Sequence, residues 1–140
     1  MLSKNLDQFQ KNKKIFGVGV DIIKNSRIKK LLKNKTFIKR VFSKKEIKNS
    51  AKYKNKTSYF SKRFAAKEAL MKAIGTGFRY NVNFKDISVI NNKLGKPQII
   101  ITNNIKRLLI NRNKLKKFRI FLSLSDEKNY SIAFIILQKN

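Results

Sequence analysis

The 140-residue sequence contains no cysteine and no histidine. These absences exclude disulfide bonds, thiolate and imidazole metal ligands, cysteine nucleophiles and a serine–histidine–aspartate triad. A metal ion bound to this chain would therefore be a hard cation that oxygen atoms hold. No apolar run approaches the roughly 20 residues of a membrane-spanning helix, and the first residues, MLSKNLDQFQKNKK, lack the apolar core of a secretory signal. We expect a soluble, cytoplasmic protein with no membrane partner.

Acidic residues are also scarce: 7 Asp and Glu stand against 35 Lys and Arg, which gives a formal net charge of +28. Such a charge can indicate nucleic-acid binding. However, most of the cations are lysines scattered along the chain, whereas base and phosphate recognition favours arginine. The lysines accompany abundant Asn, Ile and Phe, all of which AT-rich codons encode. We interpret the charge as a solvated basic surface that suits acidic or phosphorylated partners and expect no nucleic acid; a basic nucleic-acid-binding module is the alternative.

The composition predicts a flexible basic extension at residues 1–13, followed by a single domain at residues 14–140. Hydrophobic residues make up 41% of the chain, which is typical of a globular protein. Helical and extended patterns are mixed without strict alternation, so we expect an α+β fold. Apolar runs predict five strands, of which the first is buried, at residues 15–23, 84–90, 98–102, 118–124 and 130–137.

Capping residues predict where two of the shorter helices begin. Asn25 and Ser26 can cap a short helix that follows the first strand. Ser43 and Glu46 have the spacing of a capping box, in which each side chain bonds the backbone of the other residue. We therefore assign Glu46 a structural role. Asp86 is interpreted in the same way, as an acid at a turn or strand edge.

The longest predicted helix contains one isolated acid. Thr57 and Ser58 can cap this helix, and Gly75 would end it. Its apolar segment includes Glu68, whose presence needs a reason in a chain so poor in acids. Lys72 lies four residues further on, on the same stripe of the helix. The simplest interpretation is an ordinary surface ion pair between Glu68 and Lys72, worth about 0.2–0.5 kcal/mol.

A second isolated acid, Asp21, ends the apolar run that begins at Ile15. Two carboxylates in apolar surroundings suggest one shared site. Mg²⁺ typically takes one or two protein carboxylates and completes its octahedron with water and substrate phosphates. Asp21 and Glu68 are therefore candidate Mg²⁺ ligands, and Lys72 could reach the same phosphates or the attacking nucleophile. Together these residues predict a phosphoryl-transfer site.

Several short motifs follow one another along most of the chain, between residues 14 and 138. They are GVGVDI at 17–22, RFAAKEA at 63–69, KAIGTG at 72–77, FKDISV at 84–89, GKP at 95–97 and LSLS at 122–125. In this order and spacing they resemble the motifs of holo-[acyl-carrier-protein] synthases, the small 4′-phosphopantetheinyl transferases. A single FAAKEA motif would not be specific, but the ordered set is.

The resemblance implies an Mg²⁺-dependent transferase of fatty acid biosynthesis with that family's fold, an α+β fold in which a small mixed or antiparallel sheet packs on a long helix. Such enzymes move 4′-phosphopantetheine from coenzyme A to a serine of apo-acyl carrier protein and release adenosine 3′,5′-bisphosphate. It implies that Asp21 and Glu68 hold the metal and that Lys72 orients or deprotonates the serine, with a metal-bound water as the competing base. Arg27 would dock the acidic carrier protein, and members usually form homotrimers with active sites between subunits. The residues implied to bind coenzyme A are Arg63, Gly75, Thr76, Lys96, Pro97 and Ser125.

One position departs from the family pattern. The family usually has histidine followed by serine or threonine after the LSLS motif, whereas this chain has Asp126 and Glu127. Acids at this place should repel the coenzyme phosphates unless they turn away or a metal bridges them. We interpret residues 126–129 as a solvent-facing hairpin turn, with lysines such as Lys96 or Lys128 supplying the missing contact. A family member that binds coenzyme A or carrier protein without catalysis is the alternative.

Overall fold

The computed structural model describes residues 13–140, so the predicted extension at residues 1–13 lies outside it apart from Lys13. The fold is α+β, as the sequence predicts. Short 3₁₀ turns at residues 50–52 and 84–86 and a π-helical turn at residues 108–112 complete the regular structure. The helices and strands are β1 (Lys14–Lys24), α2 (Asn25–Leu31), α3 (Lys35–Val41), α4 (Lys44–Asn49), α5 (Lys56–Ile74), β2 (Ile87–Asn91), β3 (Pro97–Ile101), α6 (Asn103–Arg107), β4 (Phe118–Asp126) and β5 (Tyr130–Lys139).

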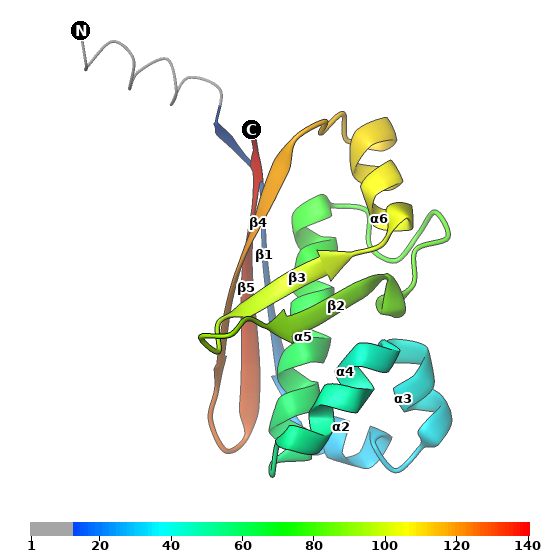
Figure 1. Cartoon of the computed structure of the whole chain (residues 1–140), viewed down its shortest axis with the longest axis vertical. Coiled ribbons are helices and arrows are strands. Elements are labelled where there is room, and N and C mark those ends of the chain that lie inside the picture. The colour runs from blue at the N-terminus through cyan, green and yellow to red at the C-terminus, as the bar shows by residue number, and fades with distance from the viewer. Residues whose placement is uncertain (1–12) are drawn as a thin grey trace, which may run out of the picture.

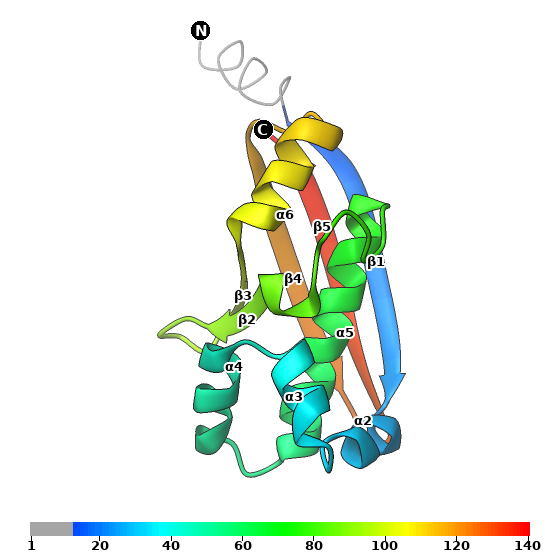
Figure 2. The same cartoon turned by 90° about the vertical axis from the view of Figure 1, so that its right-hand side faces the viewer.

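Two antiparallel sheets surround the long helix α5. The larger sheet has the strand order β1-β5-β4, and β2 pairs with β3 in a separate hairpin. Helix α5 packs against one face of the larger sheet, and the β2–β3 hairpin crosses beside it (Figure 1). Helices α2, α3 and α4 gather around the N-terminal half of α5, whereas α6 lies toward its other end (Figure 2). In this part of the chain no helix is long and apolar enough to cross a membrane.

The strand predicted at residues 15–23 is confirmed as β1, but its predicted burial is wrong. Side chains alternate along a strand, and only one face of the larger sheet is covered by α5. Val18, Val20 and Ile22 point to the other face and are 51%, 53% and 61% exposed. We call this surface the open sheet face; its further large apolar members are Phe121 on β4 and Tyr130, Ile132 and Phe134 on β5.

Two glycines let β1 lie directly on the backbone of α5. A Cβ atom added at Gly19 would lie 1.8 Å from the carbonyl oxygen of Ala69, and one added at Gly17 would lie 1.9 Å from that of Ala73. Both alanines are buried. Strand and helix therefore touch main chain to main chain, which fixes the position of Asp21, two residues after Gly19, relative to α5.

Substituting Gly19 by alanine should destabilise the protein, because the new methyl group overlaps a helix carbonyl. We expect a loss of about 3 kcal/mol in the free energy of unfolding, the upper end of the usual cost of adding a methyl group to a packed core. Urea unfolding would measure the change. Gly95→Ala is the matched control, since its added Cβ meets nothing within 4 Å and the residue is strained only by its φ of +83°. Equal losses of stability in the two variants would contradict the close contact of β1 with α5.

A buried ion pair connects α5 to the segments around it. Lys67 Nζ lies 2.6 Å from Glu46 Oε1 and also donates to the carbonyl oxygens of Val41, Phe84 and Ile87, at 2.8, 3.1 and 2.7 Å. Both charged side chains are fully buried. Burial lowers the pKa of Lys67, and the Glu46 carboxylate opposes that shift. The structural role predicted for Glu46 is confirmed, whereas no local pattern in the sequence distinguishes its partner Lys67 from the other lysines.

The hydrogen bonds of Glu46 and Asp86 confirm that both acids are structural. Glu46 forms the predicted capping box with Ser43 and also accepts from the Val89 amide at 3.1 Å. Asp86 accepts from the Asn83 amide at 2.8 Å and from the Thr102 hydroxyl at 2.7 Å. These bonds join loops and strand ends, so neither acid is free for chemistry.

Two predicted helix caps are wrong. The Asn25 side chain makes no cap; it donates to the carbonyl oxygens of Glu127 and Lys128 at 3.0 and 3.1 Å and so holds the β4–β5 hairpin. Helix α5 is capped by Asn55, whose side chain accepts from the Ser58 amide at 2.9 Å, and not by Thr57 or Ser58. In each case a tertiary contact or a nearby asparagine replaced the cap that local sequence favours.

Candidate active site

The structure brings Asp21 and Lys72 together across the contact between β1 and α5. Lys72 Nζ lies 3.0 Å from Asp21 Oδ1 and 3.0 Å from the carbonyl oxygen of Val20. The Asp21 side chain is largely covered, whereas the Lys72 side chain is 55% exposed. Within residues 13–140 Lys72 forms no ion pair with Glu68, so the simple surface pair proposed for the helix is not what forms. Lys72 instead connects α5 to the acid on the strand.

Glu68 lies half-buried next to this pair, in a pocket of about 580 Å³. Burial raises the pKa of Glu68, and the negative charge of Asp21 raises it further. The positive charges of Lys72 and Arg27 oppose the shift. Two acids, one lysine and one arginine thus act on one another electrostatically at this place. The pocket is lined by Arg27, Phe37, Arg40, Val41, Phe64, Glu68, Asn83, Phe84 and Lys85.

The two carboxylates suit an oxygen-coordinated cation. Between residues 13 and 140 no group of three or more acid side chains could hold a metal ion, so Asp21 and Glu68 would bind a cation there as a pair. Mg²⁺ is commonly bound by one or two carboxylates, with water and phosphate oxygens completing its shell. A cation between the two acids would also relieve the repulsion that raises the pKa of Glu68. The donor set therefore fits Mg²⁺, and its binding stays a prediction.

The raised pKa of Glu68 should make the folded state less stable as the solution becomes less acidic. Above the ordinary value of 4.5, the folded state holds this proton more tightly than the unfolded state, so stability falls as pH rises through the shifted range. In EDTA, we expect Glu68→Gln to raise the urea midpoint relative to the unchanged protein at pH 7 but not at pH 4. An equal difference in urea midpoint at both pH values would show that the effect does not come from the charge of Glu68.

The residues predicted to bind coenzyme A fall into two groups. Gly75 and Thr76 follow directly after α5, about one turn beyond Lys72, and Gly75 ends the helix as predicted, with φ +87°. Lys96 and Pro97 lie on the β2–β3 hairpin, in a groove of about 430 Å³ that β4 also lines through Phe121 and Leu122.

Arg63 belongs with the hairpin group. Its guanidinium donates to Asn91 Oδ1 at 3.2 Å, and Asn91 pairs with Pro97 in the ladder. The guanidinium carbon lies 3.6 Å from the Tyr59 ring centroid, and the side chain is buried. Within residues 13–140 it has no carboxylate partner, and Nε has no hydrogen-bond partner. A buried guanidinium without an acidic partner is suited to bind an anion such as a coenzyme phosphate. The contact of Arg63 with coenzyme A stays a prediction.

Ser125 lies away from the acids in the same chain. Asp21 pairs with Ala133, which pairs with Leu124, so Asp21 and Leu124 share the sheet face toward α5. Ser125 is the next residue on β4 and therefore points to the open sheet face. Strands β1 and β4 are also the two edges of the sheet. Within one chain, the predicted metal and catalytic residues are thus apart from the predicted coenzyme-binding residues beside the hairpin and β4. The first group is Asp21, Glu68 and Lys72; the second is Arg63, Lys96, Pro97 and Ser125.

The hairpin predicted at residues 126–129 is confirmed, since β4 ends at Asp126 and β5 begins at Tyr130. The Asp126 carboxylate accepts from the Ser58 hydroxyl at 2.5 Å, and Lys62 Nζ lies 3.4 Å from it. Its charge is therefore partly compensated by α5. The sequence analysis missed these two partners, which no local pattern connects to Asp126.

Residues 17–135 match the 4′-phosphopantetheinyl transferase superfamily. The chain is 62% identical over 126 residues to a holo-[acyl-carrier-protein] synthase from Pelagibacter ubique, which covers 90% of this chain and 98% of that protein. A protein of the same description from Ehrlichia chaffeensis is 50% identical over 129 residues, which covers 88% of this chain and 96% of the relative.

Solved structures agree in fold. The holo-[acyl-carrier-protein] synthase from Neisseria meningitidis superimposes with a TM-score of 0.80 at 34% identity, covering 89% of this chain and 98% of that one. The Bacillus anthracis protein, solved in complex with coenzyme A (3′,5′-ADP), has a TM-score of 0.75 at 34% identity, covering 90% and 98%. The likeness thus extends over the sheet, α5 and both groups of site residues.

Proposed function

The chain belongs to the 4′-phosphopantetheinyl transferase superfamily, and we infer from this that it is a holo-[acyl-carrier-protein] synthase: it transfers 4′-phosphopantetheine from coenzyme A to a serine of apo-acyl carrier protein. The observation that supports the chemistry best is the placement of Asp21, Glu68 and Lys72 at one contact of strand and helix. The product pair is holo-acyl carrier protein and adenosine 3′,5′-bisphosphate, and the pathway is fatty acid biosynthesis. The cytoplasmic location expected from the sequence stays a prediction.

Each of the three residues has a distinct part in the proposed mechanism. Asp21 and Glu68 hold Mg²⁺, which when bound neutralises the charge that develops on the transferred phosphoryl group. Lys72 is fixed by Asp21 and the Val20 carbonyl, while its exposed side faces solvent. As an ammonium group it is positioned to orient the serine hydroxyl, and the serine proton would then pass to another base. Gly75 and Thr76, just beyond Lys72, are placed to contact the coenzyme.

The acidic carrier protein docks on the basic rim of the Glu68 pocket. Arg27 on α2 lines this pocket, together with Arg40 on α3 and Lys85 before β2. Cations at an interface steer an acidic partner and set its orientation more than they add affinity. Docking here would bring the carrier serine to the Glu68 and Lys72 end of the site.

The active enzyme is a homotrimer whose subunits complete one another's sites. Within one chain Asp21 lies on one edge strand of the sheet, β1, whereas Ser125 lies on the other edge strand, β4, and points to the opposite face. A head-to-tail contact, in which the β4 edge of one copy meets the β1 edge of the next, would join them and close into a ring. The open sheet face supplies the apolar surface for that contact.

Phe134→Lys should convert the trimer into monomers, because three buried lysines would meet at the assembled sheets. Light scattering after gel filtration would then give the 16.4 kDa of one chain. Ile110→Lys is the control, since Ile110 is equally exposed (42% against 41% for Phe134) but lies outside the open sheet face. Transfer should be lost with the trimer, and a fully active monomer would contradict the shared site.

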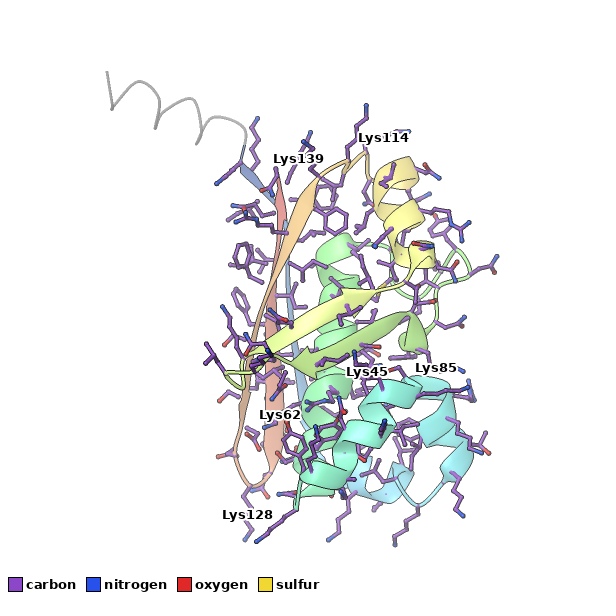
Figure 3. All side chains as sticks on the ribbon, in the orientation of Figure 1. Lys45, Lys62, Lys85, Lys114, Lys128 and Lys139 are labelled. Carbon is purple, nitrogen blue, oxygen red and sulfur yellow. The ribbon has the colours of Figure 1, made fainter. Side chains whose placement is uncertain are left out.

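Intact-mass spectrometry tests the function directly. Purified protein with coenzyme A, Mg²⁺ and an apo-acyl carrier protein should add one phosphopantetheine mass to the carrier. If the protein binds coenzyme A but transfers no phosphopantetheine at any pH or metal concentration tested, it is a non-catalytic family member. The six lysines labelled in Figure 3 extend from one end of the molecule to the other, so these six do not gather on one surface.

A further inference from the structure

A polar pocket that none of the predicted site residues lines lies between α6 and the segment that follows α5. Its volume is about 490 Å³. No acid lines it, although it is rich in hydrogen-bond donors. Figure 1 shows the two segments side by side, with α6 in yellow and the connecting loop in green. The lining residues are Tyr80, Asn81, Asn104, Arg107, Leu108, Asn111 and Arg112.

Two backbone irregularities meet at this pocket. Tyr80 and Asn81 are consecutive non-glycine residues in the left-handed region, each with φ +59°. Such residues store strain that persists only where the surrounding structure imposes it, often at ligand sites. On the other wall, residues 108–112 form a π-helical turn, and the Asn113 amide bonds the Leu108 carbonyl at 3.3 Å. π-helical turns inside helices are also frequent at functional sites.

The π-helical turn changes which arginines face the same way. In an α-helix, residues five apart point about 140° away from each other. In a π-helical turn, backbone hydrogen bonds join residues five apart, so the side chains of such residues lie on nearly the same side of the helix. Arg107 and Arg112 therefore both line this wall of the pocket. The Arg112 guanidinium lies 4.2 Å from the Tyr80 ring centroid, which joins the two irregular segments.

The charge of the two arginines is not compensated by acids. Arg107 Nη2 donates to Asn104 Oδ1 at 3.0 Å. In the part of the chain from residue 13 onward, neither arginine forms an ion pair. Arginine is the rarer cation here, with seven residues among 35 cations, yet two line one pocket. The planar forks of two guanidinium groups match the oxygens of a phosphate group.

We propose that this pocket is a second binding site, separate from the transfer site, for a small phosphorylated molecule. Arg107 and Arg112 bind the phosphate oxygens, and the side-chain amides of Asn81 and Asn111 bind the remaining polar groups. Asn104 positions Arg107, because its Oδ1 accepts from Arg107 while its Nδ2 donates to Asp86 Oδ1 at 3.3 Å. One wall of this pocket belongs to the segment between Gly75 and Phe84, which connects the end of α5 to a wall of the Glu68 pocket.

Inorganic pyrophosphate is a suitable probe, with titration calorimetry on the full chain as the measurement. We expect the double variant Arg107→Gln/Arg112→Gln to bind it at least about tenfold more weakly, because hydrogen bonds to charged groups are lost. Lys117→Gln/Lys139→Gln removes the same charge at exposed positions outside every described pocket and should change the affinity less than about twofold. Equal weakening in the two double variants would show a nonspecific charge effect and overturn the proposal.

Two further measurements separate a built site from simple attraction. Arg112→Lys keeps the charge but not the planar fork, so it should also weaken pyrophosphate binding, and unchanged binding would overturn the proposed geometry. Saturating coenzyme A should leave pyrophosphate bound. Displacement by coenzyme A would show that the probe occupies the transfer site and would overturn a separate pocket. None of these outcomes depends on catalytic transfer.

Discussion

Replacing Glu68 by glutamine should lower the rate of phosphopantetheine transfer by at least about 10²–10³-fold. The variant loses one of the two carboxylates that can hold Mg²⁺, and the metal's stabilisation of transition-state charge is worth several kcal/mol, or about tenfold in rate for each 1.4 kcal/mol. The measurement is the initial rate of mass gain of apo-acyl carrier protein under saturating Mg²⁺ and coenzyme A.

Asp21→Asn tests whether the second proposed ligand contributes to the same ion as Glu68. If both acids bind one ion, the two variants and the double variant should be impaired to a similar degree, because groups that act as a unit are not additive. Mg²⁺ should raise the unfolding midpoint of the unchanged protein but not of either variant. Full activity without Glu68, in a protein that still folds, would remove the site assignment.

Lys67→Met should destabilise the protein by about 3–5 kcal/mol, because it leaves the Glu46 carboxylate buried without its cation. The loss also frees three carbonyl oxygens, of Val41, Phe84 and Ile87, that Lys67 Nζ now satisfies. Since Val41 and Phe84 line the Glu68 pocket, the same change should disturb that pocket. Urea unfolding at pH 7 measures the loss of stability.

A double-variant cycle with Glu46→Gln isolates the ion pair. Glutamine keeps an acceptor for the Ser43 or Val89 amide but removes the unpaired charge. The combined variant should therefore be more stable than Lys67→Met alone, though less stable than the unchanged protein. Simple addition of the two single losses would mean that the charges do not interact, which is incompatible with a distance of 2.6 Å.

Local patterns in the sequence were sufficient for the elements that depend on neighbouring residues. The capping box at Ser43, the end of α5 at Gly75 and the β4–β5 hairpin all follow from residues a few positions apart. The apolar runs likewise located the strands, except that residues 84–86 form a 3₁₀ turn before β2. The electrostatic interaction of Asp21 with Glu68 could be anticipated because both are isolated acids in a chain that has few, whereas their binding of a metal stays a prediction.

Contacts between distant segments were not accessible in this way. Asn25 has the composition of a helix cap, but its side chain bonds a hairpin more than 100 residues away. Lys67 was one lysine among many until the structure showed its carbonyl ligands. The exposure of β1 was missed because an apolar strand has the same pattern whether its second face meets its own chain or another copy.

The main-chain contact of β1 with α5 also has an evolutionary consequence. The abundance of Lys, Asn, Ile and Phe indicates strong mutational pressure toward AT-rich codons, and every glycine codon begins with two guanines. Gly17 and Gly19 nevertheless stand at two positions where any side chain would meet a helix carbonyl. A codon change to another amino acid at either position would push β1 away from α5. The contact that holds Asp21 beside Lys72 therefore depends on two codons that run against the composition of the rest of the chain.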